Sequence, residues 1–159
     1  MAKSTFFYVT YIRTTPERLW TALTTDSEFM KQYWFGMHCQ SEWTPGSSWQ
    51  LVSSSGQIYD AGAIVEAEPP RRLVIRWQHQ NRPELHAEGP SLCAIDIEPS
   101  GTAIKLTITH SIDCEPSKLI EAVSGGWPKV LSNLKSLLET GTAALTDPYP
   151  AQSPQATPQ

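Results

Sequence analysis

The feature of this sequence that most limits its fold is an apolar stripe near the C-terminal end. Large apolar side chains recur there every three or four positions: Leu119, Ile120, Val123, Trp127, Val130, Leu131, Leu134, Leu137 and Leu138. That spacing predicts one long amphipathic helix over residues 116–140, with Gly141 at its C-cap. Because Pro128 disfavours helical geometry at Trp127, we also expect a kink or a short break at Gly125-Gly126-Trp127-Pro128.

The segments upstream of this helix alternate apolar and polar side chains, which is typical of strands. Strands are expected at residues 5–13, 37–43, 48–53, 57–67, 72–80, 91–98 and 102–111. In one of the clearest, Leu73, Ile75 and Trp77 share one face, whereas Arg76 lies on the other. One packed face and one wet face on each strand favour an antiparallel sheet over a parallel one.

Two short helices are predicted between the first and second strands. Thr15 followed by Pro16 is typical of a helix start, and Asp26 is typical of a second N-cap. The apolar side chains at helical spacing behind Asp26 are Phe29, Met30, Tyr33 and Trp34.

This order of elements predicts an α+β domain over residues 1–141. A curved seven-stranded antiparallel sheet is expected to wrap around the long C-terminal helix, which is the helix-grip arrangement. One helix cannot fill the hollow of so curved a sheet. We therefore expect an apolar cavity between the two, closed at one end by the short helices. Residues 142–159 are rich in Pro, Thr, Ala and Gln without an apolar period, which predicts a disordered tail.

Composition and charge narrow the classes of function. The chain is 40% hydrophobic and 18% charged, as in globular domains, and its net charge is −4. Without a basic cluster, neither nucleic acid nor a membrane surface is expected as a partner. Cys39, Cys93 and Cys114 are far apart and form no C-x-x-C pair. The chain shows no signal-peptide pattern and no apolar stretch of membrane-spanning length, so a cytoplasmic location is expected.

Histidines and carboxylates are the candidates for chemistry. The four histidines are His38, His79, His86 and His110, and none stands at metal-ligand spacing from another. Alternation places His79 on the same strand face as Leu73, Ile75 and Trp77, so we interpret its imidazole as a polar group at the cavity mouth. Asp60 and Asp96 are candidate acid–base groups, although alternation places Asp96 on the wet face. We expect no catalytic set, no metal and no cofactor.

The predicted cavity is lined by side chains from three regions. Trp77 lies on the strand face that looks inward, Trp127 lies at the expected interruption of the long helix, and Tyr33 projects from the short helices. The complete set of predicted lining residues is Tyr33, Trp34, Leu73, Ile75, Trp77, His79, Trp127 and Leu131.

Several segments together resemble a known family. They are Tyr8-Val9-Thr10-Tyr11-Ile12-Arg13-Thr14-Thr15-Pro16-Glu17-Arg18-Leu19-Trp20, Gln32-Tyr33-Trp34-Phe35-Gly36, Pro69-Pro70-Arg71-Arg72-Leu73-Val74 with Trp77, and Gly126-Trp127-Pro128 with the leucine-rich helix. They are similar to bacterial homologues of the activator of the heat-shock chaperone ATPase, within the START-like, birch-pollen-allergen-like (SRPBCC) superfamily. The resemblance spans roughly residues 5–141. It implies the helix-grip fold, a hydrophobic ligand cavity and a link to stress response.

Three hypotheses for the function follow. In the first, the domain binds a small hydrophobic or lipid-like molecule and catalyses nothing. In the second, it is a chaperone-associated module that acts through its surface. In the third, it is an enzyme of the cyclase or hydratase kind, which two inward carboxylates or a histidine–carboxylate pair would favour. Exposed strand edges in such a fold also allow a homodimer.

Overall fold

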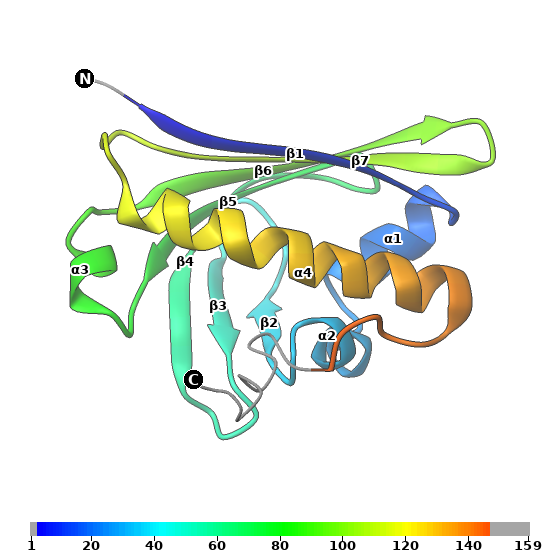
Figure 1. The fold of residues 1–159 in the computed structure, drawn as a ribbon, viewed down its shortest axis with the longest axis horizontal. Helices are drawn as coiled ribbons and strands as arrows, with labels where there is room; N and C mark the ends of the chain where they lie inside the picture. Colours follow the sequence, from blue (N-terminus) through cyan, green and yellow to red (C-terminus); the bar gives the residue numbers. More distant parts are fainter. Residues whose placement is uncertain (1–2, 147–159) are drawn as a thin grey trace, which may run out of the picture.

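The computed structural model describes residues 3–146, and the chain forms one sheet and four helices within them (Figure 1). In chain order the elements are β1 (Ser4–Ile12), α1 (Pro16–Leu23), α2 (Ser27–Tyr33), β2 (His38–Ser41), β3 (Ser48–Val52), β4 (Ile58–Glu68), β5 (Arg72–His79), α3 (Pro83–His86), β6 (Ser91–Ser100), β7 (Ala103–Ile112) and α4 (Lys118–Thr140). The predicted strands and the two early helices all occur, with ends within a few residues of those expected.

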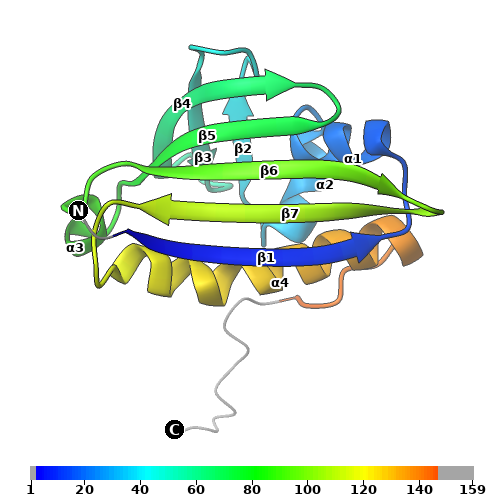
Figure 2. The same ribbon diagram turned by 90° about the horizontal axis from the view of Figure 1, so that it is seen from above.

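The sheet has seven strands in the order β1-β7-β6-β5-β4-β3-β2, and every neighbouring pair is antiparallel. Figures 1 and 2 show α4 on one side of this sheet, running along β1, while the strands curve around it. Register shifts between Leu51 and Val52 and between Ile64 and Glu66 contribute to the bend, because a bulge increases local twist. The helix-grip prediction is confirmed.

The short helices begin where the sequence predicts. Oγ1 of Thr15 accepts a hydrogen bond from the backbone N–H of Arg18 at 3.1 Å, and Oδ1 of Asp26 accepts one from Phe29 at 3.1 Å. Helix α3 was not predicted, because its four residues are too few to show a period. Its Leu85 packs with Ile112 and Leu119, and this cluster supports the start of α4.

Helix α4 corrects one prediction. It runs without a break from Lys118 to Thr140, so the short break expected at Gly125-Gly126-Trp127-Pro128 does not occur. Pro128 lacks a backbone N–H and so removes one helical hydrogen bond. The helix nevertheless buries apolar side chains before and after Pro128, and this packing outweighs the local preference of the proline against a helix. The helix begins behind Ser117, whose Oγ accepts from the N–H of Ile120 at 3.0 Å. It ends at Gly141 in the left-handed conformation, φ 86°, as predicted.

The first residues after α4 return along it. The side chain of Asn133 is fully buried, and its amide forms two hydrogen bonds with the backbone of Leu145, at 2.9 and 2.6 Å. Ala143 packs against the main core. The rest of the predicted tail, residues 147–159, lies outside the described residues, so the disordered tail and the boundary at residue 141 stay predictions.

A buried chain of hydrogen bonds ties α4 to the sheet at His110. The indole N–H of Trp127 donates to Nδ1 of His110 at 3.2 Å. Because indole only donates, the imidazole proton must be on Nε2, which lies 2.8 Å from Oγ of Ser91. The Ser91 hydroxyl donates in turn to the carbonyl oxygen of Trp77 at 2.8 Å. Every group in this chain is satisfied with His110 neutral, and burial lowers the pKa of His110 from 6.5 to about 4.

Leu134 tests whether the α4 stripe holds the fold together. Its side chain is fully buried in the main core, so Leu134→Ala removes apolar contacts and leaves a cavity. We expect the variant to lose about 2–5 kcal/mol of unfolding free energy in denaturant melts. A loss well under 1 kcal/mol would show that the helix does not depend on this contact. Lys135→Ala, on the adjacent half-exposed position, serves as the control.

His110 predicts a pH dependence of stability. Its folded pKa is lowered, so the unfolded state binds the extra proton, and the stabilisation present above pH 6.5 is lost as the pH falls toward 4. This one group should cost on the order of 3 kcal/mol of unfolding free energy across that range. We expect His110→Asn to flatten the pH dependence relative to the wild type. The exposed His86→Asn is the matched control, and equal slopes for all three proteins would contradict a neutral, buried His110.

Candidate functional site

Three tryptophans from different elements meet between the sheet and α4, and we call them the tryptophan cluster. Trp77 comes from β5, Trp127 from α4, and Trp34 directly follows α2. Ring centroids lie 6.4 Å apart for Trp34 and Trp77, 5.6 Å for Trp34 and Trp127, and 5.7 Å for Trp77 and Trp127. The cluster thus joins the two short helices, the sheet and the long helix, where the sequence predicts the cavity.

The sheet wall behind the cluster depends on a glycine. Gly62 on β4 pairs with Trp49 of β3 on one side and with Trp77 of β5 on the other. A Cβ at position 62 would lie 1.7 Å from the carbonyl oxygen of Arg76, so only glycine fits this close approach. The rings of Trp49 and Trp77 lie 4.5 Å apart at this point. Neither Gly62 nor Trp49 was among the predicted lining residues.

The other predicted lining residues divide into two groups. Tyr33 is buried beside Trp34, its ring centroid 6.5 Å away, and its hydroxyl donates to the carbonyl oxygen of Ala22 at 2.7 Å. Burial raises the pKa of that phenol well above its usual value. Leu73, Ile75 and Leu131 are buried in the same main core, without a ring or polar contact to the cluster. Their contribution to a cavity wall stays a prediction.

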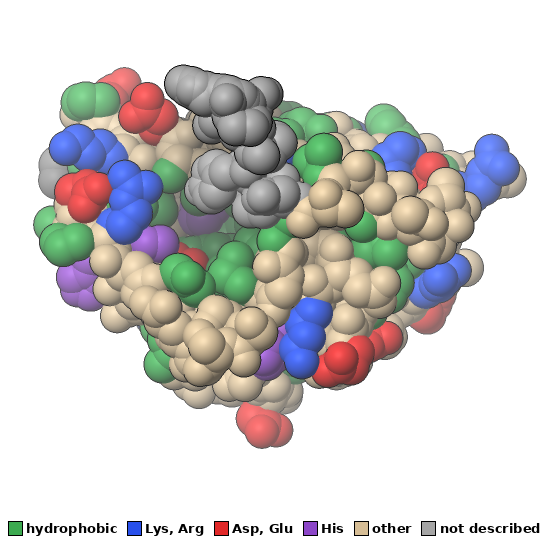
Figure 3. Space-filling view, turned by 60° about the horizontal axis from the view of Figure 1, so that its bottom comes forward, with side chains coloured by type: hydrophobic (Ala, Val, Ile, Leu, Met, Phe, Trp, Pro, Cys, Tyr) green, Lys and Arg blue, Asp and Glu red, His purple; other side chains and the backbone are tan. Residues whose placement is uncertain are grey.

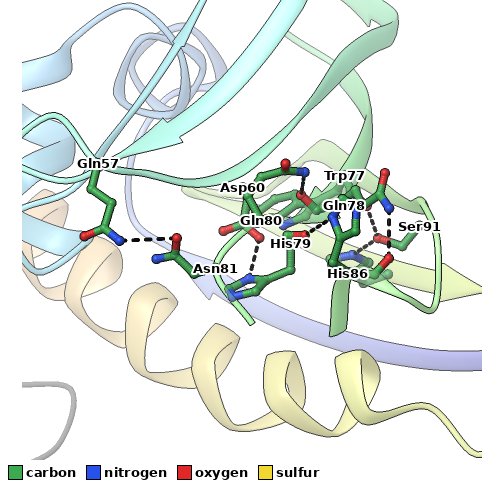
Figure 4. Close-up of polar contacts among 10 residues, drawn as sticks. Gln57, Asp60, Trp77, Gln78, His79, Gln80, Asn81, His86 and Ser91 are labelled. Carbon is green, nitrogen blue, oxygen red and sulfur yellow. Dashed lines mark hydrogen bonds and ion pairs between the residues drawn. The ribbon is translucent and has the colours of Figure 1, made fainter. Parts of the chain in front are cut away.

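Asp60 and His79 form a histidine–carboxylate pair on the inner face of the sheet. They are directly opposite each other on β4 and β5, and Nδ1 of His79 lies 2.9 Å from Oδ1 of Asp60. Figure 4 shows the two side chains pointing toward each other. The Asp60 side chain is 8% exposed and that of His79 is 17% exposed. Nε2 of His79 is buried without a hydrogen-bond partner among the described residues.

Sequence reasoning identified both residues without pairing them. Strand alternation predicts that His79 faces inward, and the sequence identifies Asp60 only as a candidate carboxylate. The pairing depends on the β4–β5 register, which the bulge between Ile64 and Glu66 shifts. Asp96, by contrast, lies on the outer face as alternation predicts, with its Oδ1 2.6 Å from Nη1 of Arg72.

The surface of the described residues carries several hollows. One of about 510 Å³ lies between the α1–α2 link and the strands β2 and β3, and mostly hydroxyl and amide side chains line it, together with His38 and Glu42. A second, of about 130 Å³, lies between α1, α2 and Leu138. None of the predicted lining residues borders either one. Figure 3 shows a further hollow on the side that lies below α4 in Figure 1, with hydrophobic and histidine side chains exposed in it.

Within residues 3–146, no group of three His, Cys, Asp or Glu side chains is arranged to hold a metal ion. None of the helices described for the chain is both long enough and apolar enough to cross a membrane.

Solved structures of similar fold come from bacteria and from a parasite. Protein MLL2253 from Mesorhizobium loti superposes with a TM-score of 0.72 at 20% identity, over 86% of this chain and 97% of that one. The Aha1 dimer from Colwellia psychrerythraea gives 0.69 at 22% identity, over 87% and 98%. PFC0360w, an HSP90 activator from Plasmodium falciparum, gives 0.69 at 20% identity, over 85% and 96%. At these identities the likeness shows the fold.

Sequence comparison identifies the family directly. No curated protein sequence is significantly similar to the chain. The family model of the Activator of Hsp90 ATPase homolog 1-like protein, however, matches residues 13–139, which span α1 to the last turn of α4 and include the tryptophan cluster. The chain therefore belongs to the family of Activator of Hsp90 ATPase homolog 1-like proteins.

Proposed function

We propose that the chain binds a small hydrophobic molecule between the sheet and α4, at the tryptophan cluster. The observation that carries the proposal is the convergence of Trp34, Trp77 and Trp127 from three separate elements on one place. Trp34 is partly exposed, so one edge of the cluster can be reached from solvent.

The energetics of such a site favour a flat, apolar ligand. Binding would remove apolar surface from water, at roughly 25 cal/mol per Å² before the costs of association are subtracted. Trp77 and Trp127 are buried in the packing of the sheet and α4, so little order has to be created at these two rings when the ligand binds. For a ligand of modest size, micromolar affinity is the expected result.

A chaperone-associated role is the second candidate, and the outer face of the sheet favours it. Phe7, Tyr11 and Leu92 are 64%, 50% and 45% exposed, and their register places all three on the face away from α4. Phe7 and Tyr11 lie on the edge strand β1, and Leu92 lies on β6, two strands away. Exposed apolar patches of this kind are typical of protein contacts. The same face would serve a homodimer, and the related Colwellia protein is described as a dimer.

An enzyme of the cyclase or hydratase kind is the third candidate, and the Asp60–His79 pair favours it. An imidazole oriented by a carboxylate supplies one acid–base group. We also propose a cytoplasmic location, where the free Cys39, Cys93 and Cys114 would stay reduced.

Trp34→Ala and Trp127→Ala test the binding proposal. Calorimetric titration of the wild type with a panel of fatty acids, flavonoids and polyketide-like aromatics should give at least one micromolar dissociation constant. Each variant should weaken that ligand about tenfold or more, because one wall of the site is removed. Trp34→Ala is the cleaner of the two, since Trp127 also donates to His110.

Lys135→Ala is the control, since Lys135 is partly exposed and its ammonium contacts Glu139, at 2.9 Å, and the carbonyl oxygen of Tyr11, with no contact to the tryptophan cluster among the described residues. It should bind like the wild type. If no compound binds and native mass spectrometry finds no co-purifying molecule, the binding proposal fails. Retention of a purified Hsp90-type chaperone by the same protein would then support the surface role.

A further inference from the structure

We infer that the Asp60–His79 pair makes the site selective for phenols, by accepting a hydrogen bond from the ligand hydroxyl at Nε2 of His79. This inference rests on the proposed function, since it names the class of ligand that the tryptophan cluster would hold. It follows from three properties of the pair: its fixed tautomer, its unpartnered nitrogen and its place beside the rings.

The tautomer of His79 is fixed by its neighbour. A carboxylate only accepts hydrogen bonds, so the 2.9 Å contact with Oδ1 of Asp60 places the hydrogen of a neutral imidazole on Nδ1. Nε2 then carries a lone pair and no hydrogen. The backbone carbonyl of His79 accepts a hydrogen bond from Nδ1 of His86 at 2.9 Å, which holds this end of β5 in place.

Nε2 of His79 is an acceptor that lacks a donor. It is buried without a hydrogen-bond partner in the described part of the chain, and such a group costs free energy until a donor reaches it. His110 on the same inner face shows the contrast, because both of its ring nitrogens are satisfied by Ser91 and Trp127. Nδ1 of His38 is also buried without a partner, but His38 lines the polar hollow beside β2. His79 is thus the histidine whose unpaired nitrogen lies on the same strand face as Trp77.

The position of His79 defines the body of the ligand. His79 and Trp77 are two residues apart on one face of β5, which is roughly 7 Å along a strand. If the ligand hydroxyl is bonded to Nε2, a fused aromatic ring system about 7 Å long would reach Trp77. Its far end would then point toward Trp34 and Trp127. In Figure 4 the imidazole of His79 projects from β5 on the side where α4 crosses.

Charge separates phenols from fatty acids. Asp60 brings a negative charge to the pair, and neither Asp60 nor His79 contacts a Lys or Arg side chain within residues 3–146. A carboxylate ligand would meet a lone pair and a nearby anion, with nothing to balance its charge. A neutral hydroxyl on an apolar ring supplies the missing donor and brings no charge.

The test compares two probes that differ only at the hydroxyl. The wild-type protein should bind 2-naphthol about tenfold or more tightly than 2-methoxynaphthalene, because the ether leaves Nε2 unpaired. Bound 2-naphthol should also show naphtholate emission on excitation, since a hydrogen-bonded base accepts the proton of the excited phenol. This comparison needs no variant.

Variants then assign the effect to the pair. His79→Leu should bring the two affinities within about twofold of each other, abolish naphtholate emission and leave the ether's affinity unchanged. Asp60→Asn, which keeps the shape of the pair, should reduce the preference because the tautomer is no longer fixed. His38→Leu, the same change in a histidine of the polar hollow by β2, should behave like the wild type.

The outcomes separate this inference from the proposed function. Equal wild-type affinities for the two probes would overturn the phenol selectivity while leaving ligand binding intact. Tightest binding of 2-naphthoate would show that His79 acts as a charged donor, which also overturns it. Failure of all three probes to bind, in a protein with normal melting behaviour, would remove the inference together with the binding site on which it rests.

Discussion

The packing of one helix against the inner face of a seven-stranded sheet is the constraint on which the rest of this structure depends. Helix α4 has to cover the concave inner face of a sheet whose strands curve around it. Aliphatic side chains such as Leu134 fill much of the space between the helix and the sheet. Toward β5, indole rings span it, and the Trp127–His110–Ser91 hydrogen bonds connect α4 to the sheet. Indole rings between a sheet and a helix offer the apolar surface that a small hydrophobic ligand binds.

The elements could be predicted from the sequence because each carries its own pattern. The α4 stripe, the alternation in β5 and the caps at Thr15 and Asp26 are local signals, and the structure agrees with them. Helix continuity through Pro128 could not be predicted in this way, since it is decided by packing on both sides. The site depends still more on distant contacts. Asp60 meets His79 through a bulged register, which no single segment encodes.

Two histidines on one sheet face differ in their hydrogen-bond partners. His110 is fully buried, neutral and satisfied at both nitrogens, and its role is to hold α4 in place. His79 keeps one nitrogen free, near the margin of the same face. Since both residues lie in strands with similar alternation, only their hydrogen-bond partners in the folded chain distinguish a fully satisfied imidazole from one with an unpaired nitrogen.

The two sides of the proposed site should respond differently to a ligand. Asp60, Gly62, Trp77 and His79 belong to adjacent strands, and the close approach of Gly62 to the backbone of Arg76 leaves that wall no room to shift. Trp34 follows a seven-residue helix and is partly exposed, with no partner strand to hold it. A ligand too large for the space would therefore displace Trp34 and the end of α2. The sheet would keep His79 and Trp77 in their positions. Selectivity would come from the rigid wall, and tolerance of different ring sizes from the helical one.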